Sequence, residues 1–448
     1  MTPRQPRKRL PHVSIPRPEV ASSASSQLVT IEKPVYGGCF LARVDSKAIF
    51  VPLTLPGEQA RIRIIEDREK RGYAKAEVEQ LLSAAAERIV PCCPHFGPCG
   101  GCNYQHTGYA NQLKIKSEIL RETLERAGVA VPHDIAILSA QPWEYRNRIR
   151  VGFDADGNPG YRARRSHDLV AIRECPIAAP LLVRAAMAAG ETLARVPSNL
   201  RPHEALLFCD AEESALLVTF FVKQPAQLRL DPLAAALRER IPQLQGAELS
   251  EGGRPGHPAR SLAQWGKPSL TYRTHKTEYR VDHGAFFQVN RWLLEPLIDH
   301  VTAGQSGALA WDLFAGVGLF ARQLAERFEQ VRAVESAGAS TAALAANLAG
   351  TGGEAVPLPV LKFLHIQRGE RPDLIVVDPP RTGLGEEINQ VLGATAAPAL
   401  VYVSCDPATL ARDLRTLLAS GYALEFVALA DLFPQTFHLE TIARLRRS

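Results

Sequence analysis

A chain of 448 residues is too long for one small domain and predicts two or three domains, each with its own hydrophobic core. Hydrophobic residues make up 46% and charged residues 22% of the chain, and no uninterrupted apolar run approaches the roughly 18 residues of a membrane helix, which excludes an integral helical membrane protein. The formal net charge of +5 fits a polyanionic partner, but a mildly basic enzyme would carry the same charge, so motifs have to decide.

The chain begins with a basic segment, residues 1–26. Its arginines and lysine lie among prolines and serines, and it lacks the apolar core of a signal peptide. We therefore predict a disordered basic tail. We also expect a cytoplasmic protein with no membrane partner.

Residues 27–85 contain short apolar runs divided by Gly and Pro. The runs read LVTIEKPVYGGCFLARV, AIFVPLTLPGE and ARIRIIED. Short strands of this kind, closely spaced and separated by turn residues, are typical of a small antiparallel barrel. The pattern predicts an OB-like domain, a fold that commonly binds oligonucleotides.

Residues 86–280 mix helical and strand-like patterns. A helix is predicted over 111–128, and strands are predicted for the runs NRIRVGFD, LLVTFFV and SLTYRT. The stretch EGGRPGHPAR at 251–260 is rich in Gly and Pro and predicts a surface loop. We expect a central α+β domain.

The central segment also carries a cysteine cluster. Cys93, Cys99 and Cys102 are closely spaced in a loop rich in Pro and Gly, and Cys175 follows far downstream. Disulfides are disfavoured in a chain without a secretory signal, so a metal site is predicted. Four thiolates suit either a structural zinc or an iron-sulfur cluster, and the spacing alone does not choose between them. Cys92 is a competing ligand.

Strands alternate with helices throughout residues 281–448. The strand-like runs are ALAWDLF, VRAVE, DLIVVD and LVYVSCD, and the run GLFARQLAERF predicts a helix after the first of them. This alternation predicts a doubly wound, Rossmann-like α/β domain with a parallel sheet.

The first strand of this domain leads into a glycine turn. Gly316 and Gly318 stand where the chain must turn sharply and allow a ligand close to its backbone. Glu335 ends the next strand, a position from which a carboxylate can hold both hydroxyls of a ribose. The turn is not a full dinucleotide fingerprint and suits S-adenosylmethionine (SAM) better than NAD. A glycine turn without a ligand is the alternative.

Two further strands end in residues that can carry chemistry. Asp378 and Cys405 both fall at the carboxyl ends of parallel strands, so they should face one crevice. His438 and Glu440 lie in a polar stretch before the last strand-like run, and Glu440 is a candidate base. Taken singly, such a cysteine is more often a buried hydrophobe, the aspartate a turn residue and the histidine a core residue.

The motifs taken together resemble the uracil-5 RNA methyltransferases, a family that modifies ribosomal and transfer RNA. The resemblance covers nearly the whole chain and rests on motifs that occur in the same order. They are IEKPVYGGCFLAR with LPGE, which looks like a TRAM domain, then CPHFGPCGGCNYQH, DHGAFFQVN, DLFAGVGLF, VVDPPRTG, VSCDPATLARDL and FPQTFHLE.

The resemblance implies a covalent mechanism. Cys405 would attack carbon 6 of uracil, because the thiolate adduct makes carbon 5 nucleophilic enough to take a methyl group from SAM. Glu440 would then act as the general base that removes the proton from carbon 5. Since a free thiol titrates near ~8.5, we expect neighbours to activate Cys405, with Arg381 as a candidate.

The resemblance also implies ligand sites. It assigns Gln288, Phe314 and Glu335 to SAM binding and Asp378 to the crevice shared by cofactor and substrate. Phe286 and Phe287 would pack against the extruded base, with core packing as the alternative. It favours a 4Fe-4S cluster over zinc, held by Cys93, Cys99, Cys102 and Cys175.

The expected partner is RNA. Within the resembling family the TRAM domain accompanies ribosomal RNA enzymes more often, so we expect 23S ribosomal RNA as the substrate and transfer RNA as the alternative. A rival of another class is a non-catalytic RNA-binding protein on a methyltransferase fold, against which the presence of both Cys405 and Glu440 argues. We expect a monomer with a tail at 1–26, a TRAM domain at 27–85, a cluster domain at 86–280 and a catalytic domain at 281–448.

Overall fold

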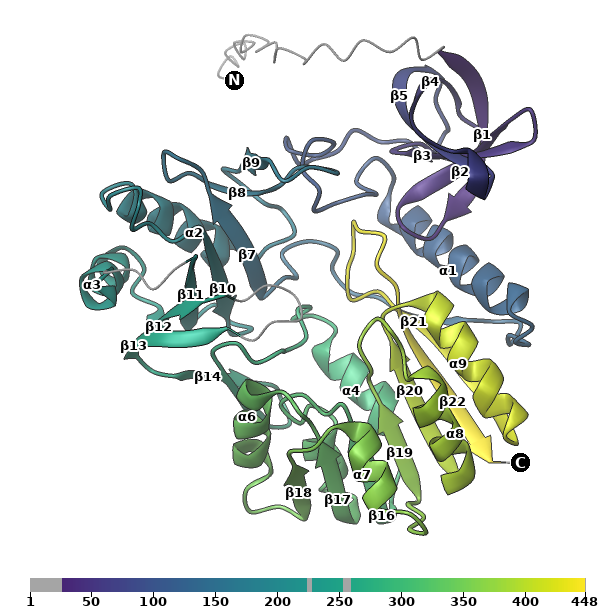
Figure 1. The fold of residues 1–448 in the computed structure, drawn as a ribbon, viewed down its shortest axis with the longest axis vertical. Coiled ribbons are helices and arrows are strands. Elements are labelled where there is room, and N and C mark those ends of the chain that lie inside the picture. Colours follow the sequence, from purple (N-terminus) through teal and green to yellow (C-terminus); the bar gives the residue numbers. More distant parts are fainter. Residues whose placement is uncertain (1–25, 224–227, 253–258, 448) are drawn as a thin grey trace, which may run out of the picture.

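The computed structural model describes residues 26–223, 228–252 and 259–447. Almost all of the predicted basic tail, and residues 253–258 of the predicted loop at 251–260, lie outside these ranges. Figure 1 shows three groups of strands: an N-terminal barrel at the upper right, a central sheet at the left and a C-terminal sheet below them. No helix in the described ranges is both long and apolar enough to cross a bilayer.

The predicted N-terminal barrel is confirmed as a closed, five-stranded barrel in the order β1-β2-β3-β5-β4. Its strands are β1 (Gln27–Val35), β2 (Cys39–Val44), β3 (Lys47–Pro52), β4 (Gln59–Arg68) and β5 (Tyr73–Ser83), with a short 3-10 helix at Glu69–Arg71. Alternate side chains such as Val29, Ile31 and Ile62 fill the interior, as the period of two along a strand requires. All pairings are antiparallel except that of β3 with β5.

The central unit is a seven-stranded sheet in the order β13-β12-β11-β10-β7-β8-β9. Its strands are β7 (Arg148–Phe153), β8 (Pro159–Arg162), β9 (Leu169–Ala171), β10 (Glu204–Cys209), β11 (Leu216–Val222), β12 (Leu244–Glu251) and β13 (Arg260–Gly266). Two helices, α2 (Pro180–Leu193) and α3 (Leu230–Arg240), pack on one face of this sheet through a common apolar core. The predicted loop at 251–260 joins β12 to β13, whose ends Glu251 and Arg260 pair across the hairpin.

The C-terminal unit is an eight-stranded sheet in the order β18-β17-β16-β19-β20-β22-β21-β6. Its strands are β6 (Ala136–Leu138), β16 (Gly307–Leu313), β17 (Phe328–Val334), β18 (Gly353–Val356), β19 (Leu374–Val377), β20 (Ala399–Ser404), β21 (Tyr422–Ala430) and β22 (Glu440–Arg447). The four predicted strands β16, β17, β19 and β20 are parallel, as expected, and β22 runs antiparallel between β20 and β21.

Helices cover both faces of this sheet, which confirms the doubly wound α/β prediction. One face carries α1 (Tyr109–Arg126), α7 (Val360–Ile366), α8 (Gly385–Thr395) and α9 (Pro407–Ala419). The other carries α4 (Leu294–Thr302), α5 (Ala321–Leu324), α6 (Gly338–Leu348) and the hairpin of β14 (Ser269–Arg273) with β15 (Glu278–Asp282). Along β19 the side chains of Ile375 and Val377 enter the first core, and those of Leu374 and Val376 enter the second.

Two details differ from the sequence-based expectation. The stretch 109–138 contributes α1 and β6 to the C-terminal unit although it precedes the central sheet in the chain, because the apolar side of α1, including Ile115 and Ile119, packs with α9 and β21. The helix predicted after the glycine turn is only one turn long, since residues 316–320 form turns before α5 begins. The proposed boundaries at 86 and 280 stay a prediction.

Candidate functional site

Cys405 and Glu440 are neighbours because of the pairing of two adjacent strands. Cys405 directly follows β20, and Glu440 is the first residue of β22. These strands are antiparallel, with Ser404 opposite Thr441, so the same register places Cys405 opposite Glu440. The sheet therefore brings a thiol and a carboxyl from positions 35 residues apart in the sequence to one point of its edge.

The surroundings of Cys405 keep its thiol protonated. Burial raises the pKa of Cys405 to about 12, and the carboxyl groups of Glu440 and Asp378 act in the same direction. Arg381 opposes them and lowers this pKa, which is the direction that the sequence predicted. The expected activation by Arg381 is thus present but is outweighed, since burial has the larger effect.

The same burial raises the pKa of the two carboxyl groups near Cys405, those of Glu440 and Asp378. Glu440 is only 3% exposed, and burial, followed by the charge of Asp378, raises its pKa well above the usual range while Arg381 lowers it. Burial also raises the pKa of Asp378 to about 7. A carboxyl with a raised pKa is a stronger base once ionised, which suits proton transfer at neutral pH.

Arg381 contacts a neutral histidine. Its guanidinium lies 3.1 Å from Nδ1 of His438. Burial, with Arg381 as the next cause, lowers the pKa of His438 to about 3, so the ring is neutral and Nδ1 accepts the hydrogen bond from the guanidinium. The ring of His438 also packs against that of Phe437 in a tilted arrangement, with 4.3 Å between ring centroids, and these contacts hold the partner of Arg381 in place.

The switch point of the sheet order lies between β16 and β19, where open α/β sheets bind ligands. Gln288, Phe314 and Asp378 line one cavity there, together with the exposed ring of Phe286 and the turn residue Gly316. The cavity has a volume of only about 30 Å³, so a ligand as large as SAM would extend along the open edge of the sheet. Three of the four cofactor-binding candidates thus meet at one point.

Glu335, the fourth candidate, supports the glycine turn. One oxygen of its carboxylate accepts the N–H of Gly316 at 3.0 Å, and the other accepts the N–H groups of Ser336 and Ala337 at 2.6 and 2.7 Å. Phe314 adopts φ +64, a conformation that non-glycine residues rarely take. The turn is held in this shape by its own hydrogen bonds, which is typical of a preorganised binding loop.

The two phenylalanines of the segment DHGAFFQVN have different environments. Phe287 is buried and packs against the rings of Phe208, Tyr272 and Tyr279. Phe286 is 59% exposed. Core packing therefore accounts for Phe287, whereas Phe286 is free to stack against a ligand.

Two residues of this region are not among the site residues that the sequence-based analysis assigned. Asp312, the penultimate residue of β16, is fully buried, and its Oδ2 accepts the N–H of Ala321 at 2.8 Å. Burial, with Asp378 and Glu335 as further causes, raises its pKa to about 8. Its place at a strand end before the glycine turn is the signal that could have identified it. Tyr36, between β1 and β2 of the barrel, donates its hydroxyl to the carbonyl of Cys405 at 3.4 Å, and no local pattern predicts that contact.

Four cysteines from two distant segments line a second cavity. Cys93, Cys99, Cys102 and Cys175 surround a space of about 340 Å³, whereas Cys92 does not line it. The described cysteines are all free, and no three His, Cys, Asp or Glu side chains in the described ranges are arranged to hold a single metal ion. The cavity is more than twenty times larger than the ~10–15 Å³ of free space that one water molecule needs.

Comparisons with known proteins agree with this architecture. Residues 366–448 match the tRNA (Uracil-5-)-methyltransferase family, and residues 24–78 match the TRAM domain. An uncharacterized RNA methyltransferase of Aquifex aeolicus is 33% identical over 435 residues, covering 93% of this chain and 97% of its own length. The 23S rRNA (uracil(1939)-C(5))-methyltransferase RlmD of Halomonas elongata is 32% identical over 453 residues, covering 95% of this chain and 90% of its own.

A solved structure supports the fold independently. The tRNA (uracil-54, C5)-methyltransferase of Pyrococcus abyssi, in complex with S-adenosyl-L-homocysteine, superposes with a TM-score of 0.74 and 22% identity, over 94% of this chain and all of that one. The barrel at the N-terminus is thus a TRAM domain and the C-terminal unit has the fold of a SAM-dependent methyltransferase. Together with the relatives aligned over nearly their whole length, these findings show that the chain belongs to the family of RNA (uracil-5-)-methyltransferases.

Proposed function

We propose that this protein methylates carbon 5 of a uridine in 23S ribosomal RNA, with Cys405 as the covalent nucleophile and Glu440 as the general base. The observation that carries the proposal is the pairing of β20 with β22, which sets a thiol beside a buried carboxyl at the ligand-binding edge of a methyltransferase sheet. A non-catalytic RNA-binding protein would have no need of this pair.

The chemistry assigns the two residues to different steps. After its proton has left to solvent, the sulfur of Cys405 adds to carbon 6 of uracil, and the electrons of the former double bond make carbon 5 nucleophilic. SAM, when bound, supplies an electrophilic methyl group, which carbon 5 takes. Glu440 then removes the proton from carbon 5, the carbon 5–carbon 6 double bond forms again, and Cys405 leaves as a thiolate.

The SAM site in this proposal is the edge between β16 and β19. Glu335 would hold the ribose through Oε2, which accepts only the N–H of Gly316 and retains acceptor capacity, whereas Oε1 already accepts two N–H groups. Gln288, Phe314 and Asp378 line the adjoining cavity and would contact the rest of the cofactor. Phe286 is placed to stack on a uracil extruded from the RNA.

The choice of 23S ribosomal RNA rests on relatives that align with both the TRAM domain and the catalytic unit. RlmD of Halomonas elongata aligns over 90% of its length. Transfer RNA is the second candidate, because the matched C-terminal family and the Pyrococcus abyssi enzyme are named for tRNA. Comparing the rate of methyl transfer to 23S fragments with that to transfer RNA decides between them.

We further propose that Cys93, Cys99, Cys102 and Cys175 hold a 4Fe-4S cluster. The fit is favourable because four thiols from two segments line one cavity of about 340 Å³, which is large for a single zinc ion. Such a cluster would tie residues 93–106 to the central sheet. Anaerobically purified protein should contain about four irons per chain and lose them on Cys102→Ser but retain them on Cys92→Ser. One equivalent of zinc, or no metal at all, would reject the cluster.

The covalent mechanism is tested with RNA that contains 5-fluorouridine. Fluorine at carbon 5 cannot leave as a proton, so the reaction should stop at a methylated adduct that survives denaturation. We expect this adduct with the unmodified enzyme and SAM and its absence with Cys405→Ala. If no RNA gives an adduct although SAM binds, the non-catalytic alternative is favoured.

A further inference from the structure

The carboxyl group of Glu440 depends on an irregular loop, which we call the base loop and define as residues 431–439. It joins β21 to β22 and directly precedes Glu440, the first residue of β22. Gln435, in its middle, has φ +67, so local preferences do not favour the observed course of the chain. The position of the carboxyl therefore depends on contacts that hold the loop from outside.

The carbonyl groups of the base loop are bonded by residues from distant segments. Asn290 donates to the carbonyl of Leu432 at 3.1 Å, and Tyr145 donates to that of Pro434 at 3.1 Å. The carbonyl of Gln435 accepts the N–H groups of Asn103 and Tyr104 at 2.8 and 3.0 Å. Asn103 directly follows Cys102, so the cysteine-rich segment itself bonds the base loop.

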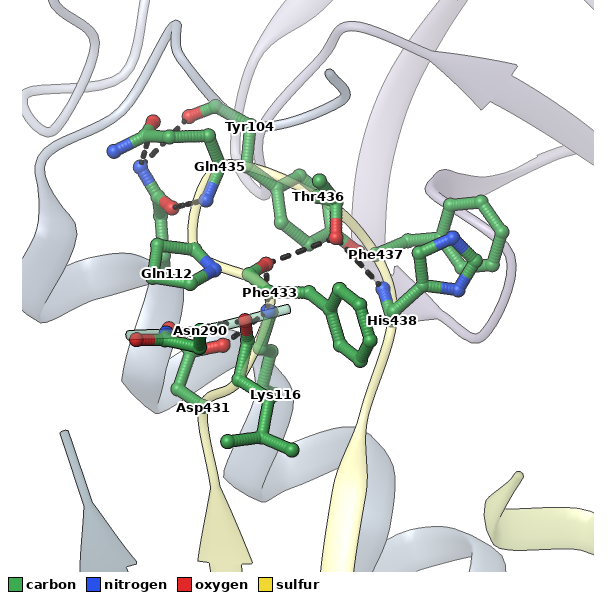
Figure 2. A network of polar contacts seen from close by, with 12 residues as sticks. Tyr104, Gln112, Lys116, Asn290, Asp431, Phe433, Gln435, Thr436, Phe437 and His438 are labelled. Carbon is green, nitrogen blue, oxygen red and sulfur yellow. Dashed lines mark hydrogen bonds and ion pairs between the residues drawn. The ribbon is translucent and has the colours of Figure 1, made fainter. Parts of the chain in front are cut away.

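Helix α1 supplies a second set of contacts, shown in Figure 2. Lys116, fully buried, donates to Asp431 at 2.6 Å and to the carbonyl of Phe433 at 3.0 Å. Gln112 forms two bonds with Gln435: its Nε2 donates to Oε1 of Gln435 at 2.9 Å, and its Oε1 accepts the backbone N–H of Gln435 at 3.0 Å.

Gln112 differs from the other residues of this network because its side chain contacts two segments outside α1, its own helix. Besides Gln435, its Nε2 lies within hydrogen-bond distance of the carbonyls of Tyr104 at 3.1 Å and Thr107 at 3.0 Å. Its side chain is 1% exposed, so water does not replace these bonds when they are lost. One amide thus links α1, the cysteine-rich segment and the base loop.

We propose that Gln112 is a positioning residue that keeps the base loop, and through it Glu440, in place for the removal of the carbon 5 proton. The inference rests on the proposed function. In the described part of the chain, the side chain of Gln112 bonds residues 104, 107 and 435 and not β20, which precedes Cys405. Addition of the thiolate and methyl transfer should therefore not depend on Gln112. Loss of the amide should therefore slow the last step selectively.

The test uses Gln112→Leu, which is similar in size but forms no hydrogen bonds, with Glu118→Leu on the exposed side of the same helix as the matched control. On ordinary uridine RNA, Gln112→Leu should turn over about 10-fold to 100-fold more slowly, because small misplacement of a catalytic group has effects of this size. It should also accumulate the methylated covalent adduct during turnover. With 5-fluorouridine RNA it should trap at the rate of the unmodified enzyme, and Glu118→Leu should match that enzyme in every assay.

Other outcomes overturn the inference. If Gln112→Leu slows trapping of 5-fluorouridine RNA as much as it slows turnover, Gln112 supports the whole site and not one step. If the turnover of Gln112→Leu is unchanged, Gln112 does not position Glu440. Should Gln112→Leu fail to fold, Gln435→Asn is measured in the same way, because asparagine tolerates positive φ and retains the backbone bonds but does not reach Nε2 of Gln112. Absence of trapping in the unmodified enzyme would instead reject the proposed function.

Discussion

The buried pair of Lys116 and Asp431 allows a quantitative test of how the base loop is held. Both side chains are inaccessible to solvent, and the ammonium lies 2.6 Å from the carboxylate. Removing one member of a fully buried pair leaves an uncompensated charge, which typically costs about 3–5 kcal/mol. Lys116→Met should lower the free energy of unfolding by an amount in this range. Methionine fills the space of the lysine side chain, but it leaves Asp431 without its partner and cannot bond the carbonyl of Phe433.

The expected result is a large fall in the melting midpoint. For a unit of ~150–250 residues, 1 kcal/mol corresponds to roughly 2–4 °C, so Lys116→Met should melt about 6–20 °C lower than the unmodified protein. Lys116→Met combined with Asp431→Leu should regain most of the loss, since an apolar pair of similar volume is often as stable as the buried ion pair. The midpoint is measured by calorimetry, which resolves separate transitions if the units of the chain unfold in more than one step.

The refuting result follows from the same cycle. A midpoint that falls by less than about 2 °C on Lys116→Met would show that the pair does not hold an unpaired charge away from water, and so that the ion pair contributes little to stability. A double variant no more stable than Lys116→Met would show that the lost stability came from the packing of α1 and not from an unpaired charge.

Three further results are expected. Glu440→Gln should still form the adduct with ordinary uridine RNA but release it at least about 100-fold more slowly, measured as denaturation-resistant complex, because the amide cannot take the carbon 5 proton. Because the pKa of Cys405 is raised to about 12, the rate of adduct formation should increase with pH across the neutral and alkaline range. Arg381→Leu removes a group that lowers this pKa, so this variant should form the adduct several-fold more slowly at pH 7. Gly38→Ala should lower both the melting midpoint and turnover, since the residue has φ +80 and its Cβ would lie 2.9 Å from Asn103 and 3.2 Å from Phe437.

The parts of the fold that sequence patterns predicted are those governed by local rules. The alternation of strands and helices after residue 281 predicted the parallel strands, because each βαβ unit is encoded within a short stretch of chain. The same rules placed Asp378 and Cys405 at the carboxyl ends of β19 and β20, and so at one edge of the sheet. The proximity of Glu440 could not be derived in this way, because it requires β22 to be inserted, antiparallel, beside β20.

What the sequence could not reveal is the support of the site by segments far away in the chain. Gln112 and Lys116 occur in a helical pattern as polar residues, and polar residues of a helix are expected to face solvent. Both are buried, because α1 lies between the barrel and α9 and directs them at the base loop, more than 300 residues later in the sequence. A helix-period pattern shows which side of α1 is apolar but contains no information about a partner loop, so the polar residues that hold the base could be identified only from the folded chain.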